Sequence, residues 1–316
     1  MTSTLWKSLA AGGVLLVALT YWLVPGWRRA AQPPAPEPPP PPSHFQIELL
    51  NQIQVETLRN QLVAADMSKD PKRLSRHEAT VYSQAGEDGA IAEIFRRIGV
   101  TNRHFVEFGS GDGSENNTVL LLEGGWSGLW MDGVEQFTKG AAEKFQAQVG
   151  SGQLRVRHAF VNAENIVELL DTAKTPAAFD LLVVDIDRND YWVWKAIRSY
   201  SPRVVVIEYN AIFPPGISWV VNYEAKSWWD GSSHFGASLT ALEKLGKEKG
   251  YSLVGCNLLG SNAYFVRDDL AGNRFASPYT AENHYQPPRY FMVWYKGGHP
   301  RKVGPPGQLE FPGHAR

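Results

Sequence analysis

The sequence predicts an α/β fold: an open, mostly parallel sheet that ends in an antiparallel hairpin. Two observations predict it. Short apolar runs alternate with helix-like segments from residue 87 onward, and the last two apolar runs are separated only by a turn. Such alternation is typical of parallel sheets with right-handed crossovers. The 316 residues are 43% apolar and include eleven Trp, so the chain can bury a substantial core.

Each element follows from the position of an apolar run. The runs predict five parallel strands, at 104–108, 127–131, 154–160, 180–184 and 203–207. The intervening and preceding segments predict helices at 87–98, 115–123, 136–149, 163–173 and 190–199. YSLVGC (251–256) and NAYFVR (262–267) lie on either side of a short segment that contains Gly260-Ser261, which predicts the hairpin.

The amino-terminal 29 residues predict a membrane anchor. Ser8–Val24 is uncharged, aromatic residues lie near both of its ends, and Pro25-Gly26 with Arg28-Arg29 follows it. No small-x-small cleavage site follows the run, which favours a retained anchor over a cleaved signal peptide. We therefore expect a single-pass membrane protein.

Four further segments complete the predicted organisation. Residues 30–43 form a proline-rich, semi-rigid linker, and 44–78 contain an amphipathic helix over 44–67. Its apolar stripe includes Leu49, Ile53, Val55, Leu58 and Leu62, and packing on the main domain is favoured over pairing with a second copy. Residues 79–296 form the predicted catalytic domain, and the Gly- and Pro-rich residues 297–316 a disordered tail.

Composition excludes some classes of function. The net charge of −1 gives no reason to expect a nucleic-acid partner. Cys256 is the only cysteine, so an internal disulfide framework is excluded, and a reducing compartment is favoured.

Polar side chains follow all five predicted strands. Because ligands bind beyond the carboxyl ends of parallel strands, this edge is where we expect a site. The residues are Glu107, Gly109, Gly111, Asp112 and Gly113 after the first strand, Asp132 after the second, Asn162 after the third, Asp185, Asp187, Asn189 and Asp190 after the fourth, and Glu208 and Asn210 after the fifth. Helix capping accounts for single members such as Asn162 and Asp190, but less well for the whole set.

The glycine spacing distinguishes between nucleotide cofactors. HFVEFGSGDG (104–113) has the pattern G-x-G-x-G preceded by Glu107, which resembles the first motif of class I S-adenosylmethionine (AdoMet)-dependent methyltransferases. The resemblance implies a Rossmann-like methyltransferase sheet and AdoMet as cofactor. It also implies that Gly109, Gly111 and Gly113 approach the cofactor closely while Glu107 orders its amino-acid end. Asp132, at the end of the second strand, suits the ribose hydroxyls.

Further segments resemble the FkbM-like branch of these enzymes. They are YSQAGEDGAIAEIF (82–95), GGWSGLWMDG (124–133), DLLVVDIDRND (180–190) and VVVIEYN (204–210). The resemblance covers about residues 80–268 and implies O-methylation of a sugar or another small hydroxylated acceptor. Gln84 and Asp88, at a helix start, are expected with Asn162 to bind the cofactor, although Asp88 also suits a role at the helix amino terminus. The fourth-strand ending, Asp-Ile-Asp-Arg-Asn-Asp, departs from the family's usual Asp-Val-Glu-Gly.

The acids after the fourth and fifth strands are the candidates for catalysis. An acceptor hydroxyl needs a general base or a divalent metal to activate it. We expect Asp185, Asp187, Glu208 and His234 to be catalytic, the last from the long 211–238 connection. Asp185, Glu208 and Asn210 would hold Mg²⁺ if the reaction is metal-assisted. The alternative is metal-free, with Glu208 paired to Arg203 or Arg188.

Two other functions fit parts of the sequence. An anchor, a stem and Asp185-Ile-Asp187 also describe a type II membrane glycosyltransferase with a metal-bound nucleotide sugar. The N-glycosylation sequon Asn116-Asn117-Thr118 inside the glycine loop argues against a luminal domain. A non-catalytic, membrane-tethered scaffold with the same fold is the second alternative. Because AdoMet is made in the cytosol, we expect the catalytic domain to face the cytoplasm.

Overall fold

A computed structural model describes residues 43–294. The chain divides into two compact units, 1–48 and 49–316, and the described part of the first is only the start of α2 (His44–Lys69). The predicted anchor, nearly all of the linker and the carboxyl-terminal tail lie outside the described residues. Within residues 43–294, no helix combines the length and apolar character needed to cross a membrane.

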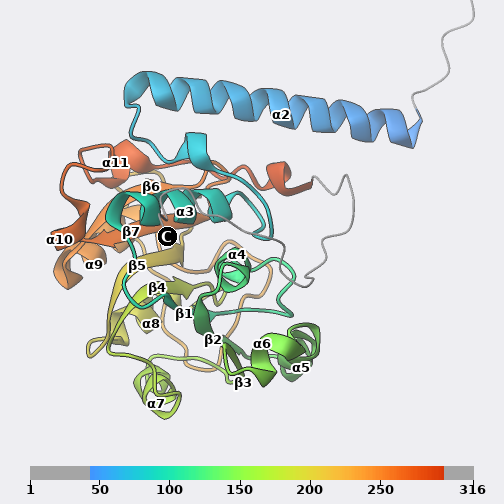
Figure 1. The fold of residues 1–316 in the computed structure, drawn as a ribbon. Coiled ribbons are helices and arrows are strands. Elements are labelled where there is room, and N and C mark those ends of the chain that lie inside the picture. The colour runs from blue at the N-terminus through green and yellow to red at the C-terminus, as the bar shows by residue number, and fades with distance from the viewer. Residues whose placement is uncertain (1–42, 295–316) are drawn as a thin grey trace, which may run out of the picture. The chain divides into compact units, whose positions relative to one another are not determined.

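The second unit contains one seven-stranded sheet (Figure 1). The strands are β1 (His104–Phe108), β2 (Ser127–Asp132), β3 (Leu154–His158), β4 (Ala178–Val184), β5 (Ser201–Glu208), β6 (Tyr251–Cys256) and β7 (Asn262–Arg267). Their order is β3-β2-β1-β4-β5-β7-β6. The first five strands are parallel, and β7 runs antiparallel to both β5 and β6. The predicted fold, a Rossmann-like α/β sheet that ends in an antiparallel hairpin, is confirmed.

Helices cover both faces of this sheet. They are α3 (Glu87–Ile98), α4 (Val119–Glu123), α5 (Glu135–Lys144), α6 (Gln146–Gly150), α7 (Ile166–Thr172), α8 (Asp190–Ala196), α9 (Leu239–Lys249), α10 (Asp268–Ala271) and α11 (Ala281–His284), with 3-10 turns η1 (Ser75–His77) and η2 (Tyr290–Trp294). The helices α3 and α4 pack on one face, and α7, α8 and α9 on the other. Burial on both sides explains why the central strands β4 and β5 are mostly apolar, whereas the edge strand β3, LRVRH, alternates apolar with charged residues and is only half-buried.

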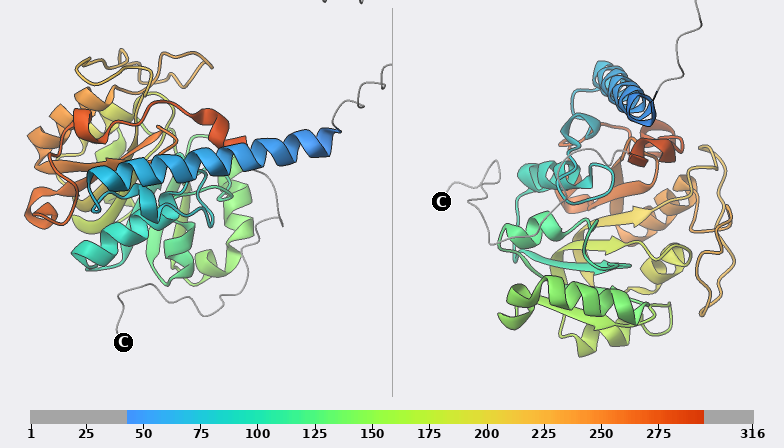
Figure 2. Two further views of the ribbon diagram at one scale, coloured as in Figure 1. Left: turned by 90° about the horizontal axis from the view of Figure 1, so that it is seen from above. Right: turned by 90° about the vertical axis from the view of Figure 1, so that its right-hand side faces the viewer.

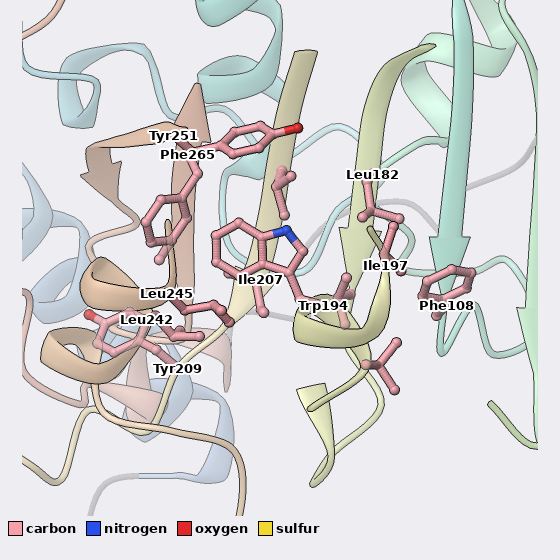
Figure 3. Close-up of a cluster of buried hydrophobic side chains, with 14 of the residues drawn as sticks. Phe108, Leu182, Trp194, Ile197, Ile207, Tyr209, Leu242, Leu245, Tyr251 and Phe265 are labelled. Carbon is pink, nitrogen blue, oxygen red and sulfur yellow. The ribbon is translucent and has the colours of Figure 1, made fainter. Parts of the chain in front are cut away.

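Alternate strand residues point to opposite cores. In β5, Val204 and Val206 join the α3 side, whereas Val205 and Ile207 join the α8 side. Trp194 of α8 is central to the second core, where its ring centroid lies 4.9 Å from that of Phe265 (Figure 3). The glycine loop and the strand ends are thus held on a rigid base.

Several predicted boundaries are wrong, for reasons found in tertiary contacts. The helix predicted at 115–123 begins only at Val119, because residues 116–118 bond to Glu107 instead of forming helical bonds. The helix predicted at 136–149 is two helices divided at Phe145, whose side chain is fully buried. The strand predicted at 154–160 ends at His158. The helices predicted at 163–173 and 190–199 are shorter, and the hairpin strands are as predicted.

The apolar stripe predicted along α2 divides into two. Val55, Leu58 and Leu62 are half-buried, whereas Leu49 and Ile53 are 45% and 53% exposed. At 100° per residue the two groups lie on different sides of the helix, so one surface cannot bury both.

Candidate active site

The three glycines after β1 have different structural roles. All have positive φ, which favours glycine. A Cβ on Gly109 would lie 1.6 Å from the Asp185 carbonyl oxygen, and one on Gly113 would meet the Phe145 ring at 2.5 Å. A Cβ on Gly111 would meet nothing within 4 Å. Gly109 and Gly113 are therefore required by chain packing, and Gly111 is the position where bare backbone borders open space.

Asp132, the last residue of β2, connects the glycine loop to the neighbouring strand. Its Oδ2 accepts the Gly111 N–H at 2.8 Å, and its Oδ1 accepts the Val134 N–H at 2.7 Å. Each carboxylate oxygen keeps a further lone pair, so the side chain can still accept hydrogen bonds from a ligand.

Glu107 is turned into the protein. It is 3% exposed and accepts hydrogen bonds from Asn116 Nδ2, the Asn117 N–H and Thr118 Oγ1. Burial raises the pKa of its carboxyl to about 7, although these hydrogen bonds favour the ionised form. The side chain shapes the segment that returns from the glycine loop to α4, and it is not among the residues that line the pocket described next.

A pocket of about 610 Å³, open mouth included, lies at the carboxyl ends of β1–β4. It is lined by Gly109, Met131, Asp132, Gly133, Val134, Ala159, Phe160, Val161, Ile186, Asp187, Asn189, Ser227 and Trp228. Two of these described lining residues are acids, and none is Lys, Arg or His. The chain order reverses between β1 and β4, which is where open α/β sheets bind ligands.

Three carboxylates come together beside this pocket. Oxygen atoms of Asp185, Asp187 and Glu208 lie within 4.8 Å of one another. Burial, then the charges of neighbouring acids, raises the pKa values of Asp185 and Glu208 well above normal. Burial also raises the pKa of Asp187, which has a φ of +64°, and raises that of Asp190 to about 7. Glu208 Oε2 is buried with no hydrogen-bond partner in the described structure. Such a group is suited to bind a cation.

The pairing considered for Glu208 is not found among the described contacts. Arg203 bonds Asp180 at 2.8 Å, and Arg188 reaches Glu224 and the His234 carbonyl.

Other predicted site residues lie outside this group. Asn210 is fully buried and donates to the carbonyls of Ser233 and Phe235. Its assignment as a metal ligand stays a prediction, and the acid that joins Asp185 and Glu208 is Asp187. His234 is exposed, its ring centroid is 6.0 Å from that of Trp219, and it does not line the pocket.

The remaining candidates organise turns. Asn162 Oδ1 accepts two backbone N–H groups before α7. Asp88 Oδ2 accepts three backbone N–H groups from residues 81–83, and the exposed Gln84 side chain reaches Glu115 at 3.3 Å. None of the three lines the pocket. Their assignment to the cofactor stays a prediction.

Sequence reasoning missed a segment near the carboxylate cluster that does not line the pocket. Segment 285–289 is fixed to the sheet edge: Tyr285 bonds the Ala211 carbonyl, and Tyr209 donates to the Gln286 carbonyl. Tyr290 follows directly, and burial with the charge of Glu208 raises the pKa of its phenol to about 12. No local motif marks this segment, because its position depends on contacts with residues some 75 positions away in the sequence.

Comparisons with known proteins give only remote structural matches. No family model matches the chain, and no curated protein matches it. Among solved structures, NcsB1, an O-methyltransferase from neocarzinostatin biosynthesis, matches 52% of this chain and 49% of its own, about half its length, with 15% identity and a TM-score of 0.33. The match to the methyltransferase domain of bacterial CtHen1-C covers 58% of this chain and 97% of that one, with 13% identity and a TM-score of 0.35. The match to a SAM-dependent methyltransferase from Clostridium acetobutylicum covers 56% of this chain and 89% of that one, also with 13% identity and a TM-score of 0.35. At these identities and TM-scores, any functional assignment rests on the site itself.

Proposed function

We propose that this protein is an AdoMet-dependent methyltransferase that modifies a hydroxyl of a small acceptor. The supporting observation is the bare backbone at Gly111, bonded to Asp132 beside a pocket whose described lining is acidic and without basic side chains. AdoMet carries a sulfonium and an ammonium but no phosphate, so carboxylates favour it. The same carboxylates would repel the phosphates of NAD or a nucleotide sugar.

The residues present fit this cofactor. Asp132 has lone pairs left for ribose hydroxyls, and Gly111 leaves room for a ligand to approach the main chain. Asp187 would place negative charge near the sulfonium. Phe160 and Val161 supply apolar surface on the β3 side.

The carboxylate cluster supplies the proposed base. When bound, AdoMet provides a methyl group on a positively charged sulfur, open to attack by an oxygen nucleophile. A carboxylate whose pKa is raised is, once ionised, a stronger base than an ordinary one, so it accepts the acceptor's hydroxyl proton more readily. Asp185 and Glu208 fit this role better than the exposed His234. Asp185, Asp187 and Glu208 could also hold Mg²⁺, which would lower the pKa of a bound hydroxyl.

The acceptor and the location are further parts of the proposal. Trp228 at the pocket mouth offers a flat surface on which a sugar or ring can stack. We place the domain on the cytoplasmic side of a membrane, held by the apolar segment 5–24. The sequon supports this side: Asn116 is 5% exposed and bonded to Glu107, so a glycan there would be incompatible with the fold.

Calorimetry of the full-length protein in detergent, titrated separately with AdoMet, a UDP-sugar and NAD, tests the function. We expect heat of binding with AdoMet alone. Binding of the UDP-sugar alone would indicate the glycosyltransferase, since Asp185 and Asp187 do lie together, and binding of none would indicate the scaffold. Reporter fusions at the carboxyl terminus test the topology, and a signal from outside the cytoplasm would refute it.

A further inference from the structure

Exposed apolar side chains gather around the pocket mouth. The described residues include thirteen large apolar side chains that are exposed, and six of them follow the carboxyl ends of β2 and β5. Four form what we call the apolar rim: Val134 (44% exposed), Phe137 (46%), Trp228 (69%) and Trp229 (47%). The apolar rim therefore lies at the sheet edge that carries the proposed active site.

The apolar rim has two sides. Val134 and Phe137 lie on the first turn of α5, where the Phe137 N–H donates to the Val134 carbonyl at 3.1 Å. Trp228 and Trp229 come from the loop between β5 and α9, which runs along one side of the domain (Figure 2). Val134 and Trp228 both line the pocket, so the two sides flank one opening. The Trp229 indole N–H donates to the Ser232 carbonyl, and about half of the side chain faces solvent.

The chemistry of the apolar rim suits a lipid surface. Tryptophan and phenylalanine are the side chains that proteins place at the membrane interface, where an apolar body enters the bilayer and a polar end stays wet. Exposed acids and bases both lie beside the rim: Glu135 pairs with Lys139, Glu224 pairs with Arg188, and Asp230 and Lys226 are exposed. With both signs of charge present, the apolar side chains favour contact with an uncharged or zwitterionic surface.

The sequence outside the described residues favours a membrane over a soluble protein. The uncharged run ends at Val24, and the described chain begins at Ser43. Residues 25–42 separate the two, and a chain of that length spans at most roughly 60 Å at about 3.3 Å per residue. A domain on such a tether stays close to the bilayer, so even weak apolar contacts with lipid are made repeatedly.

We infer that the apolar rim docks on the bilayer surface, so that the pocket opens toward the membrane. The consequence for the substrate rests on the proposed function: the acceptor is the hydroxylated head of a membrane-embedded amphiphile. Docking itself requires no methyl transfer, so it is tested separately.

The test uses single cysteines in the full-length protein. Cys256 is 5% exposed, and burial raises its thiol pKa far above the ordinary value, so it resists labelling. Trp228→Cys and Phe137→Cys place a fluorescent label on each side of the apolar rim. Ala177→Cys is the matched control, because Ala177 is exposed and precedes β4 at the opposite edge of the sheet.

Labelled protein is reconstituted in phosphatidylcholine vesicles that contain nitroxide lipid. We expect several-fold stronger quenching at positions 228 and 137 than at 177, the reverse order with aqueous iodide, and little effect of salt. Equal quenching at all three positions would overturn the inference. The inference would also be overturned if the labels at 228 and 137 were protected from iodide but not quenched by the nitroxide lipid. That result would mean that a second copy of the protein covers the rim. If the protein failed to float with the vesicles, both the docking and the membrane anchor would be refuted. The proposed function is tested separately by AdoMet binding, so the two failures can be distinguished.

Discussion

At the scale of single residues, the site depends on a few backbone contacts. Asp132 bonds the one glycine of the loop that faces open space. This links the end of β2 to the loop after β1, so a ligand resting there touches both strands.

We predict that Asp132→Ala weakens AdoMet binding by about 1–3 kcal/mol, the usual effect of losing hydrogen bonds to a charged group. Calorimetry measures the change. Glu135→Ala is the control, because Glu135 is a nearby exposed acid paired with Lys139 and should leave the affinity unaltered. Unchanged affinity in Asp132→Ala would refute the ribose assignment.

Replacing Gly109 or Gly111 by alanine adds one methyl group, and we predict that it affects stability at Gly109 and ligand binding at Gly111. Gly109→Ala forces a Cβ onto the Asp185 carbonyl and should lower the free energy of unfolding by roughly 3 kcal/mol or more. Gly111→Ala should lower the free energy of unfolding by only about 1 kcal/mol, the cost of placing alanine at a φ of +52°. Its methyl group would occupy the open space beside the backbone, so it should weaken AdoMet binding. Denaturant unfolding and calorimetry, run on both variants, separate the two effects. Equal destabilisation would contradict this division of roles.

At the scale of elements, the buried amide of Asn210 is one of the groups that hold the loop from residue 209 to 238, together with Asn189 and Trp192, which donate to loop carbonyls. Asn210 Nδ2 donates to the Ser233 and Phe235 carbonyls at 2.8 and 3.0 Å, and Oδ1 accepts the Ile212 N–H. The loop thus has a fixed base, while residues near its middle reach the pocket mouth.

We predict that Asn210→Ala loosens this loop more than it unfolds the domain. Two carbonyls lose their donor, and the local cost is about 1–3 kcal/mol for each. Limited proteolysis with trypsin should cut at exposed Lys226 several-fold faster than in the wild type. Cleavage at Lys174, exposed on another part of the domain, serves as the internal control. Parallel acceleration at both sites would indicate general unfolding instead.

The predicted elements are confirmed where the local sequence pattern agrees with the burial of the residues. All seven strands were found in the sequence: the central ones are buried on both faces and mostly apolar, and the edge strand β3 was found from its apolar residues between turn signals. Helix ends were less predictable. The helix α4 begins at Val119 because the preceding turn, which includes Thr118, is hydrogen-bonded to Glu107, eleven residues earlier. The helices α5 and α6 are separated at Phe145, whose side chain is buried in the core.

At the scale of the whole molecule, buried acids give the protein a pH-dependent stability. The pKa of Glu107 and of Asp190 is raised to about 7, and that of Glu78 to about 8. In the unfolded chain these carboxyls ionise near pH 4–4.5. Above that pH the folded state binds more protons than the unfolded state, so the free energy of unfolding falls as pH rises. Buried His104 and His284, whose pKa is lowered to about 4, act in the opposite direction only below about pH 6.5.

We therefore predict a loss of thermal stability between pH 6.5 and 8, where the acids act without opposition from the histidines. Each such carboxyl contributes up to about 1.4 kcal/mol per pH unit while it stays protonated in the folded state. Glu208→Gln should reduce the slope, because it removes one carboxyl whose pKa is raised by folding. A melting temperature that rises across this range would contradict the burial of these acids as neutral groups.

Magnesium provides a separate test of the carboxylate cluster. If Asp185, Asp187 and Glu208 hold Mg²⁺, its addition should raise the melting temperature at pH 8 more than at pH 6.5, since ionised carboxylates bind metal. EDTA should reverse the effect, and KCl at equal ionic strength should not reproduce it. An equal response in Glu208→Gln would exclude the cluster as the metal site.

The sequence by itself determined the sheet, its closing hairpin and the edge where polar residues gather, since apolar runs, the helices between them and the hairpin turn are each visible in nearby residues, and right-handed crossovers then make the strands parallel. It also supplied Asp185, Asp187 and Glu208 as candidates that the fold brings within 4.8 Å. Tertiary structure alone decided that Gly111 is the open glycine, that Glu107 faces inward, and that Trp228 and Tyr290 approach the site. These outcomes depend on contacts between segments far apart along the chain, and no local pattern of residues encodes them.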